Sequence, residues 1–473
     1  MNAIRQSTRL HLLTLAVFTA AVFLPMIGKG FIHDDFVHLF SASNDSFSRA
    51  LTSAADGPFY APTTWLTFWF DWHVWGVNPF PMAVENLLLH ILNLFLIYTL
   101  TMKLWGSKVA AFWAAFGFGL LLPANTWAIM WISTRAHVLA TTLYLSAMIA
   151  MLGLLRTGKF IHAAAVIVLG FMTVFAKESG VTLPAALALL AFYEKRTHAG
   201  KSIPLTKVVF VIGVLLGVVA LYLMMRARSG AVPFSIHVVG TYTYSLSVRN
   251  LWSNFLEYFW RTFGMLIIVG GALAFSRYLN GGRIRFNLVT RYDAVFSILL
   301  YAIMISPFMP LAGRSGIYTY MAAAASAVLL GAVVRSFYPS DEPGLTKPRT
   351  IAAVPVLLVI VTFTIFIVGQ SQKWIVTAKT TVEVLRQIST QVARPAPNTY
   401  FVLRYDAPDR EHRFPGGFET WSFPSALKLY YADPTLDGKI VLTGSSFTAP
   451  AGFGEVHLVY TNEHGQIRIS PMK

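Results

Sequence analysis

Two adjacent carboxylates lie in the first polar stretch of the chain, residues 28–46, GKGFIHDDFVHLFSASNDS. Asp34 and Asp35 stand between His33 and His38, directly after an apolar run. A carboxylate can take a proton from a hydroxyl group and so act as a general base. We therefore treat Asp34 as the first candidate for a catalytic base and Asp35 as the second.

The elements that must position these carboxylates are membrane helices. The chain has 473 residues, of which 55% are hydrophobic and 12% charged, and its mean hydropathy is +0.58. Apolar runs of about 20 residues predict spanning helices, so we expect an α-helical polytopic membrane protein of about eleven spans. These are predicted at residues 10–27, 84–102, 109–123, 136–155, 160–176, 179–193, 206–225, 252–276, 292–310, 316–334 and 351–369.

The basic residues predict the orientation of the chain. If the N-terminus, with Arg5 and Arg9, is cytoplasmic, every inner loop carries lysine or arginine, as the positive-inside rule requires. The net charge of +16 then reflects topology and not nucleic-acid binding. We expect an integral protein of the bacterial inner membrane with its C-terminal tail outside. The chain has no cysteine, which excludes disulfides and a thiolate nucleophile.

The long segments on the outer side are distinctive. Residues 28–83 are too long for a plain connector and hold Trp65, Trp69, Trp72 and Trp75. These aromatic rings either lie in the headgroup region or pack against neighbouring spans, and both alternatives stay open. Residues 125–135 are too short to span and are expected to be re-entrant or interfacial.

The tail is different in kind. After an amphipathic helix at residues 377–393 come strand patterns at 400–405, 439–444, 455–461 and 466–470, with a helix near 424–433. We therefore expect a transmembrane domain over residues 1–372 and a small extracytoplasmic α+β domain over 374–473.

Several ionisable residues are expected at the outer ends of spans, where they are costly and tend to mark functional sites. Arg135, Lys177 and Arg314 are candidates for binding a phosphate, and Glu178 follows Lys177 directly. Each alone has a structural explanation, such as a lysine that anchors its span. Within the spans, His90 is expected to be a packed, hydrogen-bonded histidine.

The chemistry that these parts fit is sugar transfer from a polyprenyl-phosphate donor. The leaving lipid phosphate needs arginine or lysine at the membrane surface, and the hydroxyl acceptor needs a carboxylate base. The expected partners are a polyprenyl-phosphate-linked sugar, membrane lipids and a hydroxyl acceptor on a protein, glycan or glycolipid.

Four segments resemble GT-C glycosyltransferases, and most closely the O-mannosyltransferase branch named for transmembrane and tetratricopeptide-repeat segments. The resemblance covers about residues 30–330. It implies an inverting transfer, a paired acidic motif at Asp34 and Asp35, a lysine-glutamate motif at Lys177 and Glu178, and an arginine-tyrosine motif at Arg314 and Tyr318. We expect Glu178, His33, His90 and Tyr318 to have supporting roles. The segments are PTTWLTFWFDWHVWGVNPFPMAVENLLLHILNLFL, PANTWAIMWISTRAHVLATTLYL, FAKESGVTLP and GRSGIYTYMAAA, the last with Arg314.

The sequence departs from that branch in places. Ala61 and Gly313 stand where the family has arginine and glutamate, and no repeat tail follows. Two rival functions stay open. One is a transporter or flippase of lipid-linked saccharides, which would need a polar path through the helices. The other is a polymerase or ligase that uses a polyprenyl-diphosphate saccharide.

A metal site is the weaker alternative for the acidic motif. Imidazole and carboxylate groups suit divalent metals, so His33, Asp34, Asp35 and His38 form a candidate ligand set. We expect no cofactor to be required, because a monophosphate donor has no pyrophosphate to neutralise.

Overall fold

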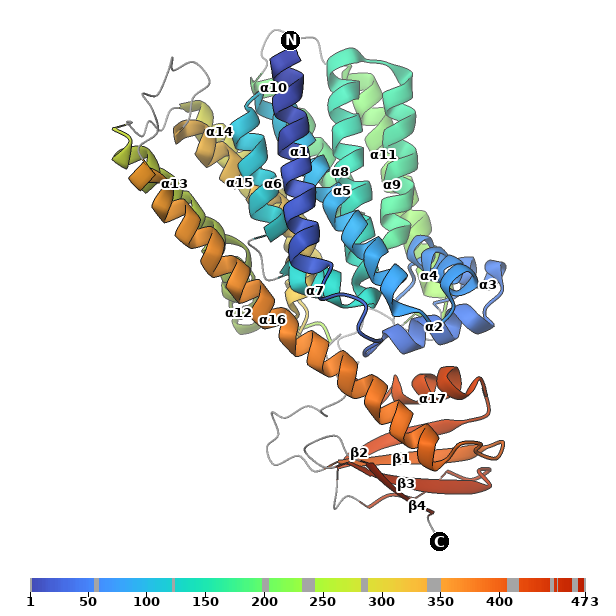
Figure 1. Cartoon of the computed structure of the whole chain (residues 1–473). Coiled ribbons are helices and arrows are strands. Elements are labelled where there is room, and N and C mark those ends of the chain that lie inside the picture. Colours follow the sequence, from blue (N-terminus) through green and yellow to red (C-terminus); the bar gives the residue numbers. More distant parts are fainter. Residues whose placement is uncertain are drawn as a thin grey trace. The chain divides into compact units, whose positions relative to one another are not determined.

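The chain forms two compact units in the computed structural model (Figure 1). Unit 1 comprises Met1–Pro25, Asn86–Ile129 and Thr134–Gly369, and unit 2 comprises Met26–Glu85, Met130–Ser133 and Gln370–Lys473. The structure describes residues 2–54, 59–120, 124–197, 204–231, 243–281, 288–337, 350–405, 417–442, 446–448, 450–461 and 467–471.

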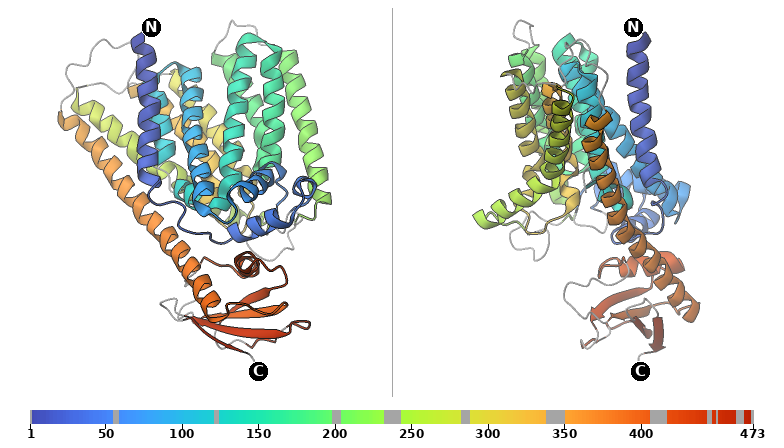
Figure 2. Two further views of the ribbon diagram at one scale, coloured as in Figure 1. Left: turned by 45° about the vertical axis from the view of Figure 1, so that its right-hand side comes forward. Right: turned by 60° about the vertical axis from the view of Figure 1, so that its left-hand side comes forward.

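Unit 1 is helical, and its helices run side by side in both views of Figure 2. The closest neighbours are α8 with α9, α14 with α15, and α15 with α6. The α-helices that contribute to it are α1 (Asn2–Phe23), α5 (Pro79–Trp105), α6 (Lys108–Leu120), α7 (Ala124–Met130), α8 (Arg135–Thr157), α9 (Phe160–Ala176), α10 (Leu183–Thr197), α11 (Leu205–Arg228), α12 (Val248–Phe259), α13 (Met265–Leu279), α14 (Leu288–Ile305), α15 (Tyr320–Phe337) and the first part of α16 (Thr350–Gln391).

Each apolar run predicted to span coincides with a helix, which confirms a largely helical membrane fold. By length and composition, seven helices of the described chain can cross a membrane, or eight if the bent pair α6 and α7 is one span. Helices α1 and α9 are apolar but shorter. The predicted number of about eleven spans is therefore not confirmed.

Short irregular helices interrupt unit 1 where several candidate site residues lie. Between α9 and α10 the chain forms the 3-10 helix η2 (Glu178–Thr182), and η5 (Gly316–Thr319) precedes α15. A π-helical turn, η3 (Trp260–Gly264), joins α12 to α13, and η4 (Ser306–Phe308) follows α14. Helix α7 is bent by 65° from α6, so residues 124–130 do not continue that helix straight on.

The first part of unit 2 contains three helices. They are α2 (Asp35–Asn44), α3 (Phe47–Thr52) and the tryptophan-rich α4 (Pro62–Trp75), and α2 and α3 both pack against α4. Trp65 and Phe68 of α4 are buried, whereas Phe70 and Trp75 are exposed. One side of α4 thus packs inward and another exposes aromatic rings. Some rings can therefore pack against neighbouring helices, and others can lie in the headgroup region.

The tail folds as the strand and helix patterns predicted. Its sheet has the order β2-β1-β3-β4, with β1 parallel to both β2 and β3 and a terminal antiparallel hairpin of β3 and β4. Helix α17 (Phe423–Tyr431) packs on β2 and also on α2. The strands are β1 (Thr399–Tyr405), β2 (Asp437–Leu442), β3 (Glu455–Thr461) and β4 (Ile467–Pro471).

The predicted boundary between the two domains, at residues 372–374, lies inside a helix. The predicted span at 351–369 and the predicted amphipathic helix at 377–393 form one continuous helix, α16, of 42 residues. Residues 370–376 contain neither proline nor glycine, so nothing in them stops a helix. The segment 28–83, which we assigned to the transmembrane domain, lies in the same compact unit as the tail. A tail that folds independently stays a prediction.

Candidate functional site

The acidic motif forms the turn that leads into α2 in unit 2. His33 has a φ of 49°, a backbone conformation that is uncommon for residues other than glycine. Its N–H donates to the carbonyl of Gly417, and its Nδ1 lies 3.5 Å from Glu419 Oε1. The ring of His33 also meets the rings of Trp131 and Trp374 edge-on. Contacts from three distant parts of the chain therefore fix this turn.

Asp34 occupies the N-cap position of α2, but its side chain makes no capping hydrogen bond. Instead, Oδ1 accepts a hydrogen bond of 2.7 Å from Trp421 Nε1. Asp34 is only partly buried. A positioned carboxylate that is not fully enclosed has the properties that a general base needs.

Asp35 is the first residue of α2 and is only 1% exposed. Its Oδ2 accepts from the N–H of Ile32 at 3.0 Å, and Oδ1 accepts from Ser133 N–H at 2.7 Å and from Ser133 Oγ at 2.5 Å. Burial raises the pKa of Asp35 to about 7, although these hydrogen bonds act in the opposite direction. Oδ1 of Asp35 thus joins the turn to residues 130–133, while Oδ2 closes the turn on Ile32.

The four proposed metal ligands serve other contacts. The ring of His38 packs against Trp65 and Phe68, with centroid distances of 4.5 and 5.2 Å. Within the part of the chain that the structure describes, no group of three or more histidine, aspartate or glutamate side chains has an arrangement suited to a metal ion.

In unit 1, Arg135 begins α8 and is 1% exposed. Its Nε donates to Asn86 Oδ1 at 2.9 Å, and Asn86 Nδ2 donates to the carbonyl of Ala128. A buried guanidinium is costly unless it is hydrogen-bonded, so Asn86 is a necessary partner. Arg135 is therefore held in a defined position by α5.

Lys177 and Glu178 form an ion pair with a separation of 3.0 Å between Nζ and Oε1. Adjacent residues do not face each other on one helix, but Lys177 has an extended backbone between α9 and η2, so the two side chains can meet. Lys177 is buried. Burial raises the pKa of Tyr244 to about 12, with nearby Glu178 adding to the rise and Arg226 opposing it.

Arg314 belongs to a second cluster in unit 1. Its Nε donates to Asn254 Oδ1 at 2.7 Å, and its Nη1 lies 3.1 Å from Glu257 Oε2. The other oxygen of Glu257 accepts from Arg261 at 2.6 Å, at the i,i+4 spacing that brings side chains together on a helix. One carboxylate is thus shared by two arginines, and the cluster keeps an excess of positive charge.

Aromatic contacts connect the starts of α8 and η5. Tyr318 stacks on Phe308 and also contacts His137, which lies two residues after Arg135. His90 is fully buried: Nδ1 is 2.7 Å from Tyr320 Oη, and Nε2 is 3.1 Å from the carbonyl of Gly119. This confirms the prediction that His90 is packed and hydrogen-bonded.

The structure therefore divides the predicted residues into two sets. Unit 2 contains His33, Asp34, Asp35 and His38, whereas unit 1 contains His90, Arg135, Lys177, Glu178, Arg314 and Tyr318. Sequence reasoning missed the residues that hold them in place, because those partners are ordinary polar or aromatic residues at distant positions. The main ones are Asn86, Ser133, Asn254, Glu419 and Trp421.

Comparison by sequence finds no matching family model and no matching curated protein. Solved structures do resemble the fold. ArnT from Cupriavidus metallidurans in the apo state gives a TM-score of 0.55 at 12% identity, over 95% of this chain and 92% of that one. The same protein has been solved bound to undecaprenyl phosphate, and that structure gives a TM-score of 0.52.

Two larger proteins also match. The Archaeoglobus fulgidus oligosaccharyltransferase gives a TM-score of 0.52 at 12% identity, over 91% of this chain and 64% of that one. Arabinofuranosyltransferase AftD from Mycobacteria gives 0.51 at 12% identity, over 84% of this chain and 29% of that one. These neighbours are GT-C glycosyltransferases. The protein therefore has the GT-C membrane fold, as the sequence resemblance implied.

Proposed function

We propose that this protein is an integral membrane glycosyltransferase. It moves a sugar from a polyprenyl-phosphate donor to a hydroxyl acceptor, with inversion, on the outer (periplasmic) face of a bacterial inner membrane. The proposal is supported by the GT-C fold and by the undecaprenyl phosphate bound to ArnT. The acceptor is a hydroxyl group of a protein, glycan or glycolipid.

We assign the base from the different surroundings of the two adjacent carboxylates. Asp34 is partly buried and accepts a hydrogen bond from the indole of Trp421, whereas Asp35 is enclosed and accepts hydrogen bonds from Ile32 and Ser133. A base must be reached by the acceptor hydroxyl, and Asp34 meets that requirement better. We assign Asp34 as the base and Asp35 as the residue that fixes the turn.

The chemical step balances with these groups alone. The acceptor oxygen attacks the anomeric carbon of the donor sugar as its proton passes to Asp34. The bond from that carbon to the phosphate oxygen breaks, and the lipid phosphate leaves with the bonding electrons. The transition state is oxocarbenium-like, as at other glycosyl centres, and an anionic carboxylate also stabilises that charge. No metal is assigned a role in this step.

The basic residues of unit 1 are assigned to the donor phosphate. Lys177 supplies a buried ammonium, and Arg135 and Arg314 supply guanidinium groups, whose planar donors suit a phosphate. Each of these residues already has a fixed partner in Glu178, Asn86 or Asn254, so little side-chain ordering is left for binding.

The test is transfer by the purified full-length protein from polyprenyl-phosphate sugars. Asp34→Asn removes the base but keeps an oxygen that can accept from Trp421. Loss of a general base lowers rates by about a hundredfold to ten-thousandfold, so we expect a drop of that size with unchanged thermal stability. The matched control is Glu85→Gln, because Glu85 also lies in unit 2 and accepts a hydrogen bond of 2.8 Å from the indole N–H of Trp75.

Three outcomes would contradict the proposal. Wild-type rates in Asp34→Asn would remove the base assignment. Equal losses in Asp34→Asn and Glu85→Gln would show a general effect on unit 2. Transfer only from polyprenyl-diphosphate saccharides, or movement of the lipid across the membrane without transfer, would favour the rival functions.

A further inference from the structure

A polar pocket lies in unit 1, at the opposite end of α5 from Asn86. It has a volume of about 460 Å³, within the range of small-ligand sites. The last turns of four helices, α5, α8, α10 and α15, build it, at the end of the unit where α1 begins (Figure 1). The lining residues are Met102, Lys103, Leu104, Trp105, Gly106, Arg156, Glu194 and Arg335.

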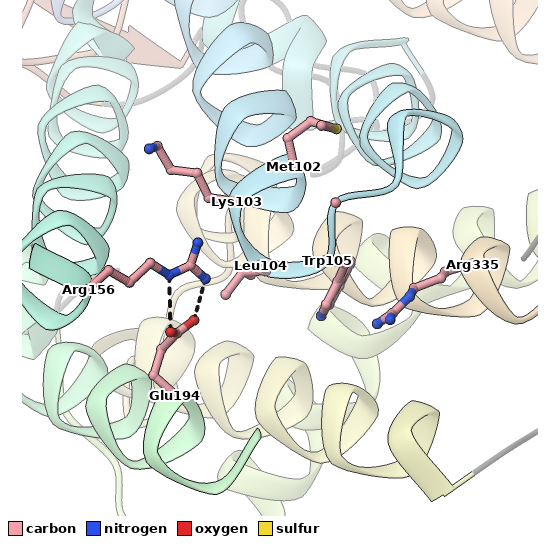
Figure 3. A pocket seen from close by; sticks show the side chains of 8 residues that line it. Met102, Lys103, Leu104, Trp105, Arg156, Glu194 and Arg335 are labelled. Atoms are coloured by element: carbon pink, nitrogen blue, oxygen red, sulfur yellow. Dashed lines mark hydrogen bonds and ion pairs between the residues drawn. The ribbon is translucent and has the colours of Figure 1, made fainter. Parts of the chain in front are cut away.

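The pocket combines apolar walls with an excess of positive charge. In Figure 3, Arg156 and Arg335 extend towards Leu104 and Trp105 from opposite sides. Arg156 makes a two-pronged ion pair with Glu194, at 2.7 and 3.2 Å, and Arg335 lies 3.3 Å from Asp293 behind the pocket wall. Of the three cations that line the pocket in the described part of the chain, Lys103 is therefore the one that forms no ion pair with a carboxylate.

Hydrogen bonds hold the Trp105 side of the pocket in place. Trp105 Nε1 donates to Tyr193 Oη at 3.0 Å, and Tyr193 in turn donates to Asp293. Leu104 and Trp105 are both buried. The walls are therefore fixed by hydrogen bonds and packing, while the exposed Lys103 side chain stays available to a ligand.

Basic residues at the last turns of helices also have a purely structural explanation, because cations complement the C-terminal end of a helix. Two features of the pocket are not accounted for by that explanation. Arg156 and Arg335 turn to carboxylates on neighbouring helices, and a space of about 460 Å³ remains between them. The pocket therefore has room for an anion beside Lys103, whose charge no carboxylate of the pocket lining balances.

The position of the pocket at the ends of membrane helices indicates which class of anion it can bind. Three of the four helices, α5, α8 and α15, are long and apolar enough to cross a membrane, so their ends lie near the headgroups. Basic pockets between membrane helices bind lipid phosphates. Met102, Leu104 and Trp105 suit the glycerol and first methylene groups beside such a phosphate. We infer that this pocket binds the phosphate headgroup of an anionic membrane lipid.

Native mass spectrometry of the full-length protein tests this inference without any transfer assay. Wild type should retain phosphatidylglycerol more tightly than phosphatidylcholine. Lys103→Ala should weaken phosphatidylglycerol binding about fivefold, the equivalent of about 1 kcal/mol per basic residue near the surface, and Lys103→Arg should restore it. Lys195→Ala is the matched control, because Lys195 is exposed on α10 next to Glu194 but does not line the pocket.

Each other result overturns the inference. Equal retention of the two lipids, or unchanged binding in Lys103→Ala, would mean that the pocket does not select an anionic headgroup. Equal weakening in Lys195→Ala would indicate diffuse surface charge. Displacement of the lipid by excess inorganic phosphate, with phosphate alone stabilising wild type but not Lys103→Ala, would assign the pocket to a soluble phosphate.

Discussion

The two carboxylates of the acidic motif illustrate how neighbours in sequence acquire different tasks. Asp35 is buried and accepts hydrogen bonds from Ile32 and Ser133, whereas Asp34 is only partly buried and accepts one from Trp421. The pair of acidic residues was recognisable in the sequence. Their distinct surroundings were not, because Ser133 and Trp421 lie 98 and 387 residues away along the chain.

The raised pKa of Asp35 predicts a pH dependence of stability. Between its ordinary pKa of 3.8 and the folded value of about 7, the folded protein binds more protons than the unfolded chain. The contribution of Asp35 to stability is therefore greatest below about pH 4, falls as pH rises towards 7, and is then constant. The measurement is thermal unfolding of wild type and Asp35→Asn across this range, with the difference between them as the readout.

At low pH, Asp35→Asn should be less stable than the wild type. The difference in stability should shrink as the pH rises, because only the wild type carries the carboxyl group that titrates. The amide group in Asp35→Asn would set N–H donors against the N–H groups of Ile32 or Ser133, a loss of about 1–3 kcal/mol. A difference that grew from pH 4 to pH 7 would mean that the hydrogen bonds outweigh burial and that Asp35 has a lowered pKa.

Lys177→Ala tests the phosphate assignment in unit 1. If Lys177 binds the donor phosphate, its loss should raise the donor concentration needed for half-maximal transfer by about tenfold or more, since a hydrogen bond to a charged group contributes about 1.5–3 kcal/mol. Glu178→Gln is the matched control, because it breaks the same ion pair but keeps the ammonium group. The measurement is the donor dependence of the rate in folded protein. The same donor dependence in both variants would leave Lys177 with a structural role only.

At the scale of elements, the apolar runs predicted where helices lie in the described chain but not the breaks between them. The turn at Lys177 and the 65° bend between α6 and α7 depend on tertiary packing, which periodicity does not encode. The continuity of α16 was missed for a related reason. Its polar residues near Gln370 are typical of a loop but are equally acceptable in an exposed helix.

The connection of α9, η2 and α10 allows a test at this scale. Gly180 lies where an added Cβ would come 2.5 Å from the carbonyl oxygen of Thr173, so the backbone must shift. Gly180→Ala should therefore destabilise the protein by about 1–3 kcal/mol, as overpacking usually does. Thermal unfolding measures the change.

Gly217→Ala in α11 is the control for this substitution. A Cβ there meets nothing within 4 Å, and alanine is the better helix former, so stability should stay the same or rise by up to about 1 kcal/mol. Equal effects of the two substitutions would show that the close approach of η2 to α9 does not limit residue 180.

At the scale of the whole molecule, each compact unit joins segments that lie far apart in the sequence. The sequence indicated the long first outer segment and the tail separately. Their membership in one unit rests on contacts such as the stacking of Phe36 on Phe418 and the packing of α17 on α2. Such contacts join residues hundreds of positions apart, and with a single sequence no local pattern reveals them.

The location of the tail tests on which side of the membrane the acidic motif works. Asp34 and the tail belong to the same compact unit, and the positive-inside pattern predicts that this unit lies outside. Because the chain has no cysteine, a single introduced thiol reports its own location. Lys439 is exposed on β2 and Lys195 is exposed on α10, so Lys439→Cys and Lys195→Cys form a matched pair. In intact spheroplasts a membrane-impermeant maleimide should label Lys439→Cys, and it should label Lys195→Cys only after lysis. The reverse pattern would place the tail and Asp34 in the cytoplasm, where they could not use a donor presented on the periplasmic face.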